Sequence, residues 1–426
     1  MIPALHVGRR GLEAGLRTAD RGFASGPLSR SGRRWLVATE VAIAVVILAG
    51  TGLLYHSVIR LTHVDLGFNP HNLLAVELGL PQDLRSHGSR ADVYQFYTRA
   101  IEDLATMPVV ESVAAVGQRP LKGPIGLDAS WEFEGQTPDA AKKNPWFNLE
   151  PITPTYFTTI GTHVIAGREF DDRDRMTTEP VVIVNDKLAR YAWPGQSAVG
   201  KRIRAAGLDL GRRRSTWWTV VGVVSDIRYR EIGATTLDVY VPFAQSWFPV
   251  GDVMIRTTVP PAALASAVRT RLRQIDRGGI IDIWVMDRVV ETHQAPWRTN
   301  LLLFGLFAVL TVLVASVGLY AMLAAIVVEQ SHEIGIRMAL GATVPRIIRT
   351  ILSEGMLSVI PGVAAGLAAF AASSRLMRTI LFEVSPLDMA AWVGAAATLF
   401  SVSIAACAIP AVRAARVDPS ICLRVE

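Results

Sequence analysis

Four long apolar stretches constrain this chain more than any other feature. A helix needs about 20 apolar residues to cross the hydrocarbon core of a bilayer. Four segments meet that length, at residues 35–59, 300–328, 351–373 and 389–409. Only 19% of the 426 residues are charged, whereas a typical soluble domain carries about 25%. The pattern predicts an α-helical membrane protein with four transmembrane helices.

The interval between the first two apolar segments, residues 60–299, is long enough for a sizeable domain. Each of its ends reads as strand, helix, strand, and a β-rich stretch at about 128–245 lies between them. The first unit is expected at residues 73–78, 89–107 and 109–116, and the second at 252–256, 261–275 and 280–286. This arrangement predicts an α+β domain, namely a split β-α-β sheet with a β-rich inserted subdomain.

Arginines gather beside the apolar segments. Residues 1–34 hold seven arginines against two acidic residues, and further arginines follow the second and fourth segments. These are Arg337, Arg346, Arg349, Arg413, Arg416 and Arg424. Because short loops rich in Arg stay in the cytoplasm, we expect both termini and residues 329–350 to be cytoplasmic. Residues 60–299 and the short loop 374–388 are then periplasmic, and the chain is a multi-pass protein of the bacterial inner membrane.

The two ends of the chain follow from the same reasoning. Residues 1–34 predict a basic, flexible lead-in rather than a cleavable signal peptide, because they contain no apolar core. Residues 35–59 are therefore expected to remain as an anchor, and 410–426 to form a cytoplasmic tail. The net charge of +6 reflects these membrane flanks, which argues against a nucleic-acid-binding protein.

Residues 195–202, G-Q-S-A-V-G-K-R, come within one position of a phosphate-binding loop. The motif requires Ser or Thr after the lysine to hold magnesium, and it follows a strand and opens a helix. Here Arg202 occupies the metal-ligand position, and the stretch follows a predicted helix and precedes a predicted strand. It also lies on the expected outer side, where ATP is scarce. The chain is not expected to bind or hydrolyse ATP.

No other catalytic, cofactor-binding or metal-binding pattern is present in the sequence. There is no H-E-x-x-H or G-x-S-x-G motif. The acidic run 171–174 lacks the glycine and distal glutamate of a calcium loop, so we expect a solvated turn. Trp217, Trp218 and Trp247 either anchor a small core, which we favour, or form a binding surface. We therefore expect no enzyme, and a membrane-anchored hydrolase is the least supported alternative.

A short amphipathic segment connects the second and third apolar segments. Glu329, Glu333 and Arg337 are predicted to share one helical face, and Ile334 and Met338 a less polar one. Glu333 and Arg337 have the favourable i,i+4 order, and Gly341 is expected to end the helix. Two interpretations remain open: an interfacial helix stabilised by lipid headgroups, or a lever that a cytoplasmic partner moves.

Two further features lie inside the predicted membrane helices. Gly362 and Gly366 form a G-x-x-x-G pattern, which permits close packing between helices. Glu40 is an acidic residue inside an apolar segment, and such residues are functional candidates. Its separation from Arg34 also allows its carboxylate to reach the cytoplasmic interface.

These residues together resemble a known family. One helix, a large exported domain and three further helices, with E-I-G-I-R-M-A-L-G-A at 333–342 and R-A-A-R-V-D-P-S-I-C-L-R-V-E at 413–426, resemble the MacB/FtsX-type ABC transporter permeases. Four other stretches resemble one half-unit of the duplicated orphan permeases of acidobacteria. They are G-R-E-F at 167–170, W-P-G-Q-S-A-V-G-K-R-I at 193–203, V-V-G-V-V-S-D-I-R at 220–228 and L-F-E-V-S-P-L-D at 381–388.

The resemblance implies a MacB-like periplasmic core domain with a porter-like sheet subdomain. It also implies a non-catalytic subunit without cofactors, which transmits movement from a separate cytoplasmic ATPase, itself the ATP-binding partner, to the periplasm. Such permeases work as homodimers or pseudo-dimers with a related half, and the resemblance admits a periplasmic adaptor. An FtsX-like scaffold that regulates a cell-wall hydrolase is the alternative. The implied ATPase-coupling residues are Glu329, Glu333, Ile334, Gly335, Arg337, Met338, Leu340 and Gly341.

Overall fold

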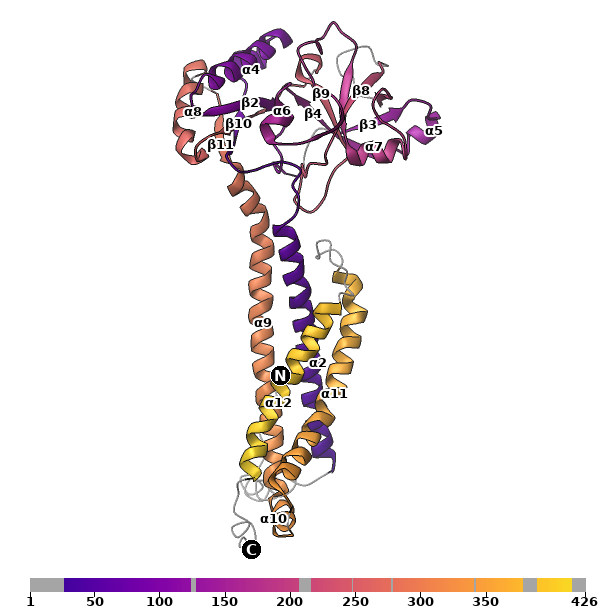
Figure 1. Ribbon diagram of the computed structural model, residues 1–426, viewed down its shortest axis with the longest axis vertical. Helices are drawn as coiled ribbons and strands as arrows, with labels where there is room; N and C mark the ends of the chain where they lie inside the picture. Colours follow the sequence, from indigo (N-terminus) through magenta and orange to yellow (C-terminus); the bar gives the residue numbers. More distant parts are fainter. Residues whose placement is uncertain are drawn as a thin grey trace, which may run out of the picture. The chain divides into compact units, whose positions relative to one another are not determined.

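The computed structural model describes residues 27–123, 128–206, 216–246, 248–276, 279–340, 342–377 and 389–415. The chain divides into two compact units (Figure 1). We call residues 1–60 and 297–426 the membrane domain and residues 61–296 the head domain.

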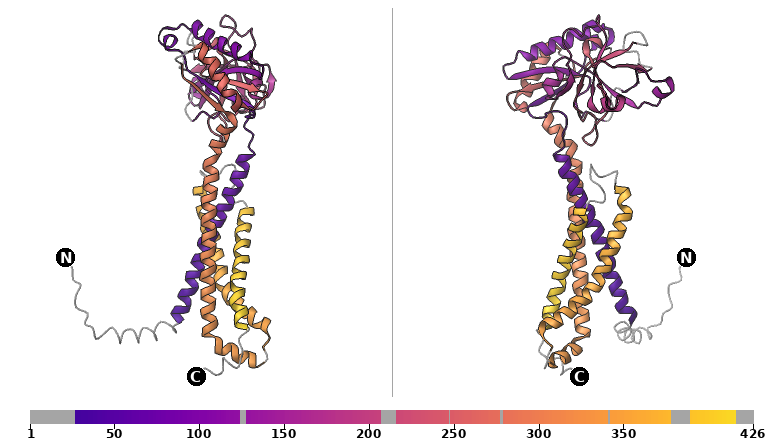
Figure 2. Two further views of the ribbon diagram at one scale, coloured as in Figure 1. Left: turned by 90° about the vertical axis from the view of Figure 1, so that its left-hand side faces the viewer. Right: turned by 45° about the vertical axis from the view of Figure 1, so that its right-hand side comes forward.

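Within the described residues, the membrane domain contains four long helices, which Figure 2 shows from two sides. Each is long and apolar enough to cross a bilayer, which confirms the predicted fold class. They are α2 (Pro27–Thr62), α9 (Met286–Glu329), α11 (Val344–Met377) and α12 (Met389–Ala415). A short helix, α10 (Ser331–Ala339), connects α9 to α11. Helix α9 begins fourteen residues before the predicted apolar segment, directly after the last strand of the head domain, and contains Pro296.

The two glycines of the G-x-x-x-G pattern lie where α11 packs against α2. A Cβ at Gly362 would come within 2.6 Å of the Ala38 carbonyl oxygen, and one at Gly366 within 2.6 Å of the Val45 Cβ. Any larger side chain would therefore push the two helices apart. Glu40 lies opposite another glycine, because a Cβ at Gly318 of α9 would meet its Oε2 at 2.2 Å.

The four-stranded part of the head domain carries the predicted split β-α-β arrangement. Its strands are β1 (Leu73–Leu78), β2 (Val110–Val116), β10 (Asp252–Thr257) and β11 (Ile281–Val285), and its helices are α4 (Arg90–Ala105) and α8 (Pro261–Ile275). The order β11-β1-β10-β2 interleaves the two units, with every pairing antiparallel.

Helices α4 and α8 lie on this sheet because each has an apolar stripe (Figure 1). Phe96, Ala100 and Leu104 of α4 recur at i,i+4 and are buried, and Leu264, Val268 and Leu272 of α8 do the same. Ser89 and Asp92 cap α4 reciprocally, which satisfies two donors at its first turn.

The remaining strands continue the same sheet in the order β4-β3-β7-β8-β6-β9, and β5 pairs with β8. We call this the inserted part. Its strands are β3 (Asp128–Phe133), β4 (Trp146–Ile152), β5 (Val164–Gly167), β6 (Val181–Asn185), β7 (Arg202–Ala206), β8 (Trp218–Val224) and β9 (Asp238–Pro242). Short helices connect elements of the head domain: α3 (Gln82–His87), α5 (Pro138–Ala141), α6 (Tyr156–Ile160), α7 (Asp186–Ala192) and η1 (Phe243–Gln245).

The inserted part has its own apolar core, which includes one of the tryptophans considered above. Trp218 is buried in this core beside Trp131, as favoured from the sequence. Trp217 instead lies beneath the guanidinium of Arg204, 4.8 Å from it. Trp247 lies outside the described residues.

The near-match to a phosphate loop is a turn between a helix and a strand. Helix α7 begins after Asn185, whose side chain accepts from the Leu188 amide, and ends at Ala192. Gly195 and Gly200 then adopt positive φ angles of 72° and 86° before β7 begins at Arg202. The order of elements is the reverse of a phosphate-binding loop.

Substituting the packed glycines is expected to destabilise the membrane domain. Gly362→Leu and Gly366→Leu should each lower the free energy of unfolding by roughly 1–3 kcal/mol, since overpacking has that cost. Gly305→Leu and Gly394→Leu are matched controls, because a Cβ at either position meets nothing within 4 Å. Thermal unfolding of the purified chain in detergent measures the difference, and equal midpoints for all four variants would contradict the close packing.

Candidate coupling site

Helix α10 is amphipathic and separated from α9 by a single break. Gln330 caps it with φ −98° and ψ 6°, so the chain turns between the two helices. Ile334 and Met338, one turn apart, pack against the apolar core of the membrane domain together with Ile347 and Ile351 of α11. One face of α10 is therefore part of that core.

The opposite face of α10 is exposed and mixed in character. Glu333 and Arg337 form the predicted i,i+4 ion pair, with side chains 56% and 54% exposed. Ile336 and Leu340 also point outward, and Leu340 is 82% exposed. Apolar side chains surrounded by charges, left accessible at the end of a bundle, are typical of protein interfaces.

Three expected features of this segment differ from the structure or fall outside it. Glu329 is exposed in the last turn of α9, before the break, so it does not share a helix with Glu333 and Arg337. Gly335 is buried against the core. Gly341 lies outside the described residues. Ile336 was missed, although its i,i+4 relation to Leu340 marks a second apolar pair on the outer face.

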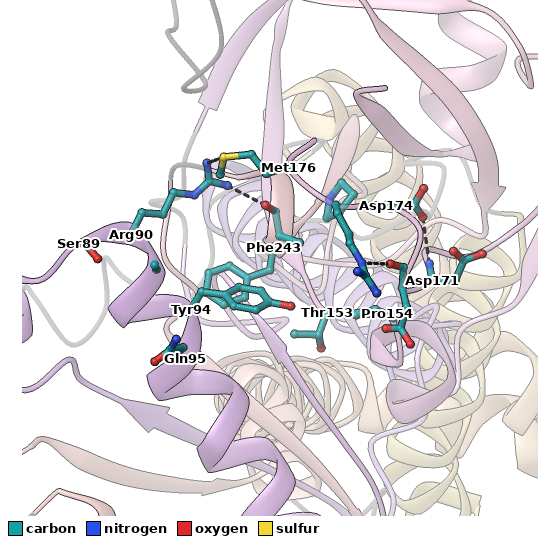
Figure 3. Close-up of a pocket in the computed structure, with 15 residues that line it drawn as sticks. Ser89, Arg90, Tyr94, Gln95, Thr153, Pro154, Asp171, Asp174, Met176 and Phe243 are labelled. Carbon is teal, nitrogen blue, oxygen red and sulfur yellow. Dashed lines mark hydrogen bonds between the residues drawn. The ribbon is translucent and has the colours of Figure 1, made fainter. Parts of the chain in front are cut away.

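The head domain contains an open pocket of about 780 Å³ between α4 and the inserted part (Figure 3). Tyr94 of α4 and Met176 of the inserted part lie on its walls, and Phe243 lines it after β9. Arg90 donates to the Ala244 carbonyl oxygen at 2.9 Å and contacts the Met176 sulfur at 3.2 Å. Pockets of about 300–1,000 Å³ with mostly apolar walls and a few polar groups hold small molecules in other proteins.

Two carboxylates of the acidic run 171–174, which lies beside this pocket, are paired with arginines. Asp174 is buried and accepts two hydrogen bonds from Arg168, at 2.7 and 2.8 Å. Hydrogen bonds from Arg173 hold the pKa of Asp171 well below its usual range. Among the described residues, no group of three or more His, Cys, Asp or Glu side chains is placed to hold a metal ion.

Three carboxyl groups are buried in the head domain, two of them (Glu150 and Asp252) where the inserted part joins the four-stranded part and Asp238 inside the inserted part. Glu150 of β4 accepts from the Gln118 amide, Asp252 of β10 from the Arg119 amide, and Asp238 of β9 from the Asn148 side chain. Burial raises the pKa of all three, that of Asp238 to about 7. The parallel pairing of β4 with β9 places Asn148 beside Asp238, a contact between residues far apart in sequence.

The comparison with known families decides the identity of the chain. Residues 36–275, more than half of its length, match the MacB-like periplasmic core domain, and residues 305–419 match the FtsX-like permease C-terminal domain. The chain belongs to the MacB/FtsX-type permeases.

Similar proteins agree with this family. The "Probable syringafactin export ATP-binding/permease protein SyfD" of Pseudomonas syringae pv. tomato is 27% identical over 283 residues, covering 64% of this chain and 41% of SyfD. The "Macrolide export ATP-binding/permease protein MacB" of Azoarcus sp. is 26% identical over 373 residues, covering 83% of this chain and 51% of that MacB. The chain thus spans about half the length, or less, of these curated relatives.

The head domain also has similar solved structures. The periplasmic region of MacB from Actinobacillus actinomycetemcomitans aligns over 55% of this chain and 97% of that structure, with 15% identity and a TM-score of 0.36. The extracellular domain of the transporter YknZ from Gram-positive bacteria aligns over 50% of this chain and 100% of that structure, with 17% identity and a TM-score of 0.33.

The raised pKa of the buried Asp238 makes the stability of the head domain depend on pH. The pKa of Asp238 is higher in the folded state than in the unfolded state, so the folded state binds more protons. Protonation of Asp238 therefore stabilises the folded head domain at low pH, and this contribution is lost as pH rises from about 4 to about 7. We expect the head domain to lose roughly 2–4 kcal/mol of stability across this range through Asp238, with Glu150 adding in the same direction.

Hydrogen exchange of head-domain amides in the full chain measures this dependence, after correction for the intrinsic effect of pH on exchange. Asp238→Asn should flatten the slope. Asp172→Asn is the matched control, because Asp172 is exposed and should leave the slope unchanged. A wild-type head domain that gains stability between pH 4 and 7 would contradict the prediction.

Proposed function

We propose that the chain is the permease subunit of an ABC transporter and transmits movement from a separate cytoplasmic ATPase to the head domain, driving export. The observation that carries this proposal is that one face of α10 packs against the membrane-domain core and the opposite face is exposed. Ile334 and Met338 are partly buried and pack against the membrane-domain core, whereas Glu333, Arg337, Ile336 and Leu340 are exposed. A partner that binds the exposed face of α10 also displaces the face that packs on the core, because both faces belong to one nine-residue helix.

Displacement of α10 reaches the rest of the chain through packed side chains. Ile334 and Met338 contact a core built from α2, α9, α11 and α12, and tightly packed interiors transmit small shifts. The chain passes from the membrane domain into the head domain through α2 and back through α9. The movement can therefore reach the head domain without passage of cargo between the helices.

The proposal includes the orientation and the partners. Arginine-rich flanks favour cytoplasmic termini and a periplasmic head domain, so α10 faces the cytoplasm. The names of the relatives describe combined ATP-binding and permease proteins, and this chain matches about half of each or less. We assign ATP binding to the partner, expect no cofactor in this chain, and expect a homodimer or a pseudo-dimer with a related half. A periplasmic adaptor is a further candidate partner.

A second candidate function is a scaffold that regulates a periplasmic cell-wall hydrolase. The match of residues 305–419 to the FtsX-like C-terminal domain favours it, as does the open pocket of the head domain, which is accessible to a protein partner. Capture of a cell-wall hydrolase by the head domain of the full chain, with no export defect on deletion of the chain, would support this function over export.

Substitutions on the outer face of α10 test the docking of the ATPase. Ile336→Ser and Leu340→Ser should each reduce its co-purification about tenfold, because truncating a contributing interface residue costs more than about 1 kcal/mol and about 1.4 kcal/mol corresponds to tenfold. Val412→Ser, an exposed valine of α12, is the matched control. Quantitative mass spectrometry of the purified complex measures the ratio of the two proteins. Unchanged ATPase in both α10 variants would overturn the docking site.

Orientation is tested with single cysteines at two exposed positions. In a chain carrying Cys407→Ala and Cys422→Ser, we expect Trp146→Cys of the head domain to react with a membrane-impermeant maleimide in spheroplasts. Leu340→Cys should react only after the membrane is permeabilised. Both side chains are largely exposed, at 69% and 82%, so access differs only through the membrane. Equal labelling of both positions in intact spheroplasts would contradict the orientation.

A further inference from the structure

An ion pair joins α2 to α11 beside the coupling helix. Arg34 donates from Nη2 to Glu354 Oε2 at 2.5 Å, and both side chains are partly buried. The two residues line a small recess together with Met322, Ile326 and Gln330. Gln330 is the residue at which the chain turns from α9 into α10. The pair therefore lies directly beside the break between these helices.

The ion pair is the first of a series of contacts along the same two helices. Further along α2, Ala38 contacts Gly362, and Ala42 contacts Gly366, where a Cβ would meet its carbonyl oxygen at 2.7 Å. Residue numbers rise together on both helices, so α2 and α11 run parallel from the end of the domain that carries α10. Val41 and Val45 of α2 pack against the same two glycines, so this part of the seam between α2 and α11 is held by shape and apolar contact, and none of these residues has a polar side chain.

The ion pair adds a directional constraint at one end of this seam. A salt bridge requires its two groups to stay within about 4 Å, which fixes the position of one helix along the other more specifically than apolar contacts do. Arg349 is the nearest arginine before Glu354 on α11, but it is exposed and forms no ion pair among those found in the described residues. Arg33 has interactions of its own and lines the same recess.

We propose that Arg34 and Glu354 are positioning residues that tie α2 to α11, so that displacement of α10 moves α2, and with it the chain entering the head domain. Helix α11 follows α10 after a short connection, and α2 leads into the head domain at residue 61. The ion pair therefore connects the helix next to α10 with the helix that enters the head domain. Without the pair, only the apolar contacts of the seam couple the two helices, so α2 follows α11 less closely. This inference rests on the proposed function.

The tie itself is measured in the full chain alone, reconstituted in lipid nanodiscs. Spin labels replace Trp35 and Leu357, which are exposed neighbours of the paired residues, in a chain carrying Cys407→Ala and Cys422→Ser. We expect a narrow distance distribution for the native pair and a clearly broader one for Arg34→Gln or Glu354→Gln. The reversed pair, Arg34→Glu with Glu354→Arg, should restore the narrow distribution. Arg349→Gln is the matched control and should leave it narrow.

Transmission is measured on the complex with the ATPase that co-purifies. Hydrogen exchange of head-domain amides is compared between the nucleotide-free and the ATP–vanadate-trapped states. Arg34→Gln and Glu354→Gln should retain the ATPase and its hydrolysis but lose at least about half of the nucleotide-dependent change, since breaking such a pair shifts an equilibrium up to about fivefold. If the pair had a purely structural role, the neutral variants would have lower thermal stability but would not lose the nucleotide-dependent change while they keep ATPase binding and hydrolysis. The reversed pair would then not restore the response.

The outcomes separate the two proposals. If the wild-type chain retains no ATPase, or shows no nucleotide-dependent change, the proposed function fails and the transmitting role of the pair fails with it. If the wild-type chain responds and the neutral variants respond equally, only the role of Arg34 and Glu354 is overturned. Unchanged distance distributions in the neutral variants, or a folded reversed pair that stays broad, also overturn the tie.

Discussion

Close packing between helices that lipid surrounds is the constraint on which the membrane domain depends. Lipid tails are as apolar as leucine side chains, so helices associate through shape and through polar contacts rather than by escaping water. Gly362 and Gly366 supply the shape, because they let α11 approach the backbone of α2. The Arg34–Glu354 pair supplies a polar contact at the end of the same seam. Helix α10 joins this assembly through Ile334 and Met338, so its position is set by the same packing.

The head domain is held together by different forces. Two apolar cores lie on its continuous sheet, one under α4 and α8 and one in the inserted part. Their junction contains buried carboxyl groups as well as apolar side chains, with Glu150 and Asp252 accepting from the amides of Gln118 and Arg119 beside the buried Val116 and Ile152. The hydrogen bonds of these carboxyl groups give the junction a preferred geometry, since hydrogen bonds weaken steeply when they are misaligned.

The sequence predicts local features well and distant contacts poorly. The four apolar segments, the interleaved β-α-β units and the Glu333–Arg337 pair all follow from periodicities of a few residues, and the structure contains each of them. Ile336 was missed because the apolar residues of α10 were assigned to a single face. Neither Arg34 with Glu354, which are 320 residues apart, nor Asn148 with Asp238 leaves a local pattern, because pairings of this kind are created only when the sheet and the bundle close.

The interleaved strand order also determines when the head domain can assemble. Strand β1 lies between β10 and β11, both of which are synthesised long after it. Until residue 257 is synthesised, both edges of β1 lack their partners, and the edge that pairs with β11 lacks its partner until residue 285. Unpaired edges invite wrong pairing. Strands β3 to β9 depend on no later segment for most of their ladders, so the inserted part can mature first. During synthesis the inserted part can therefore be complete while the four-stranded part still has unpaired strand edges, and the risk of wrong pairing falls on the four-stranded part.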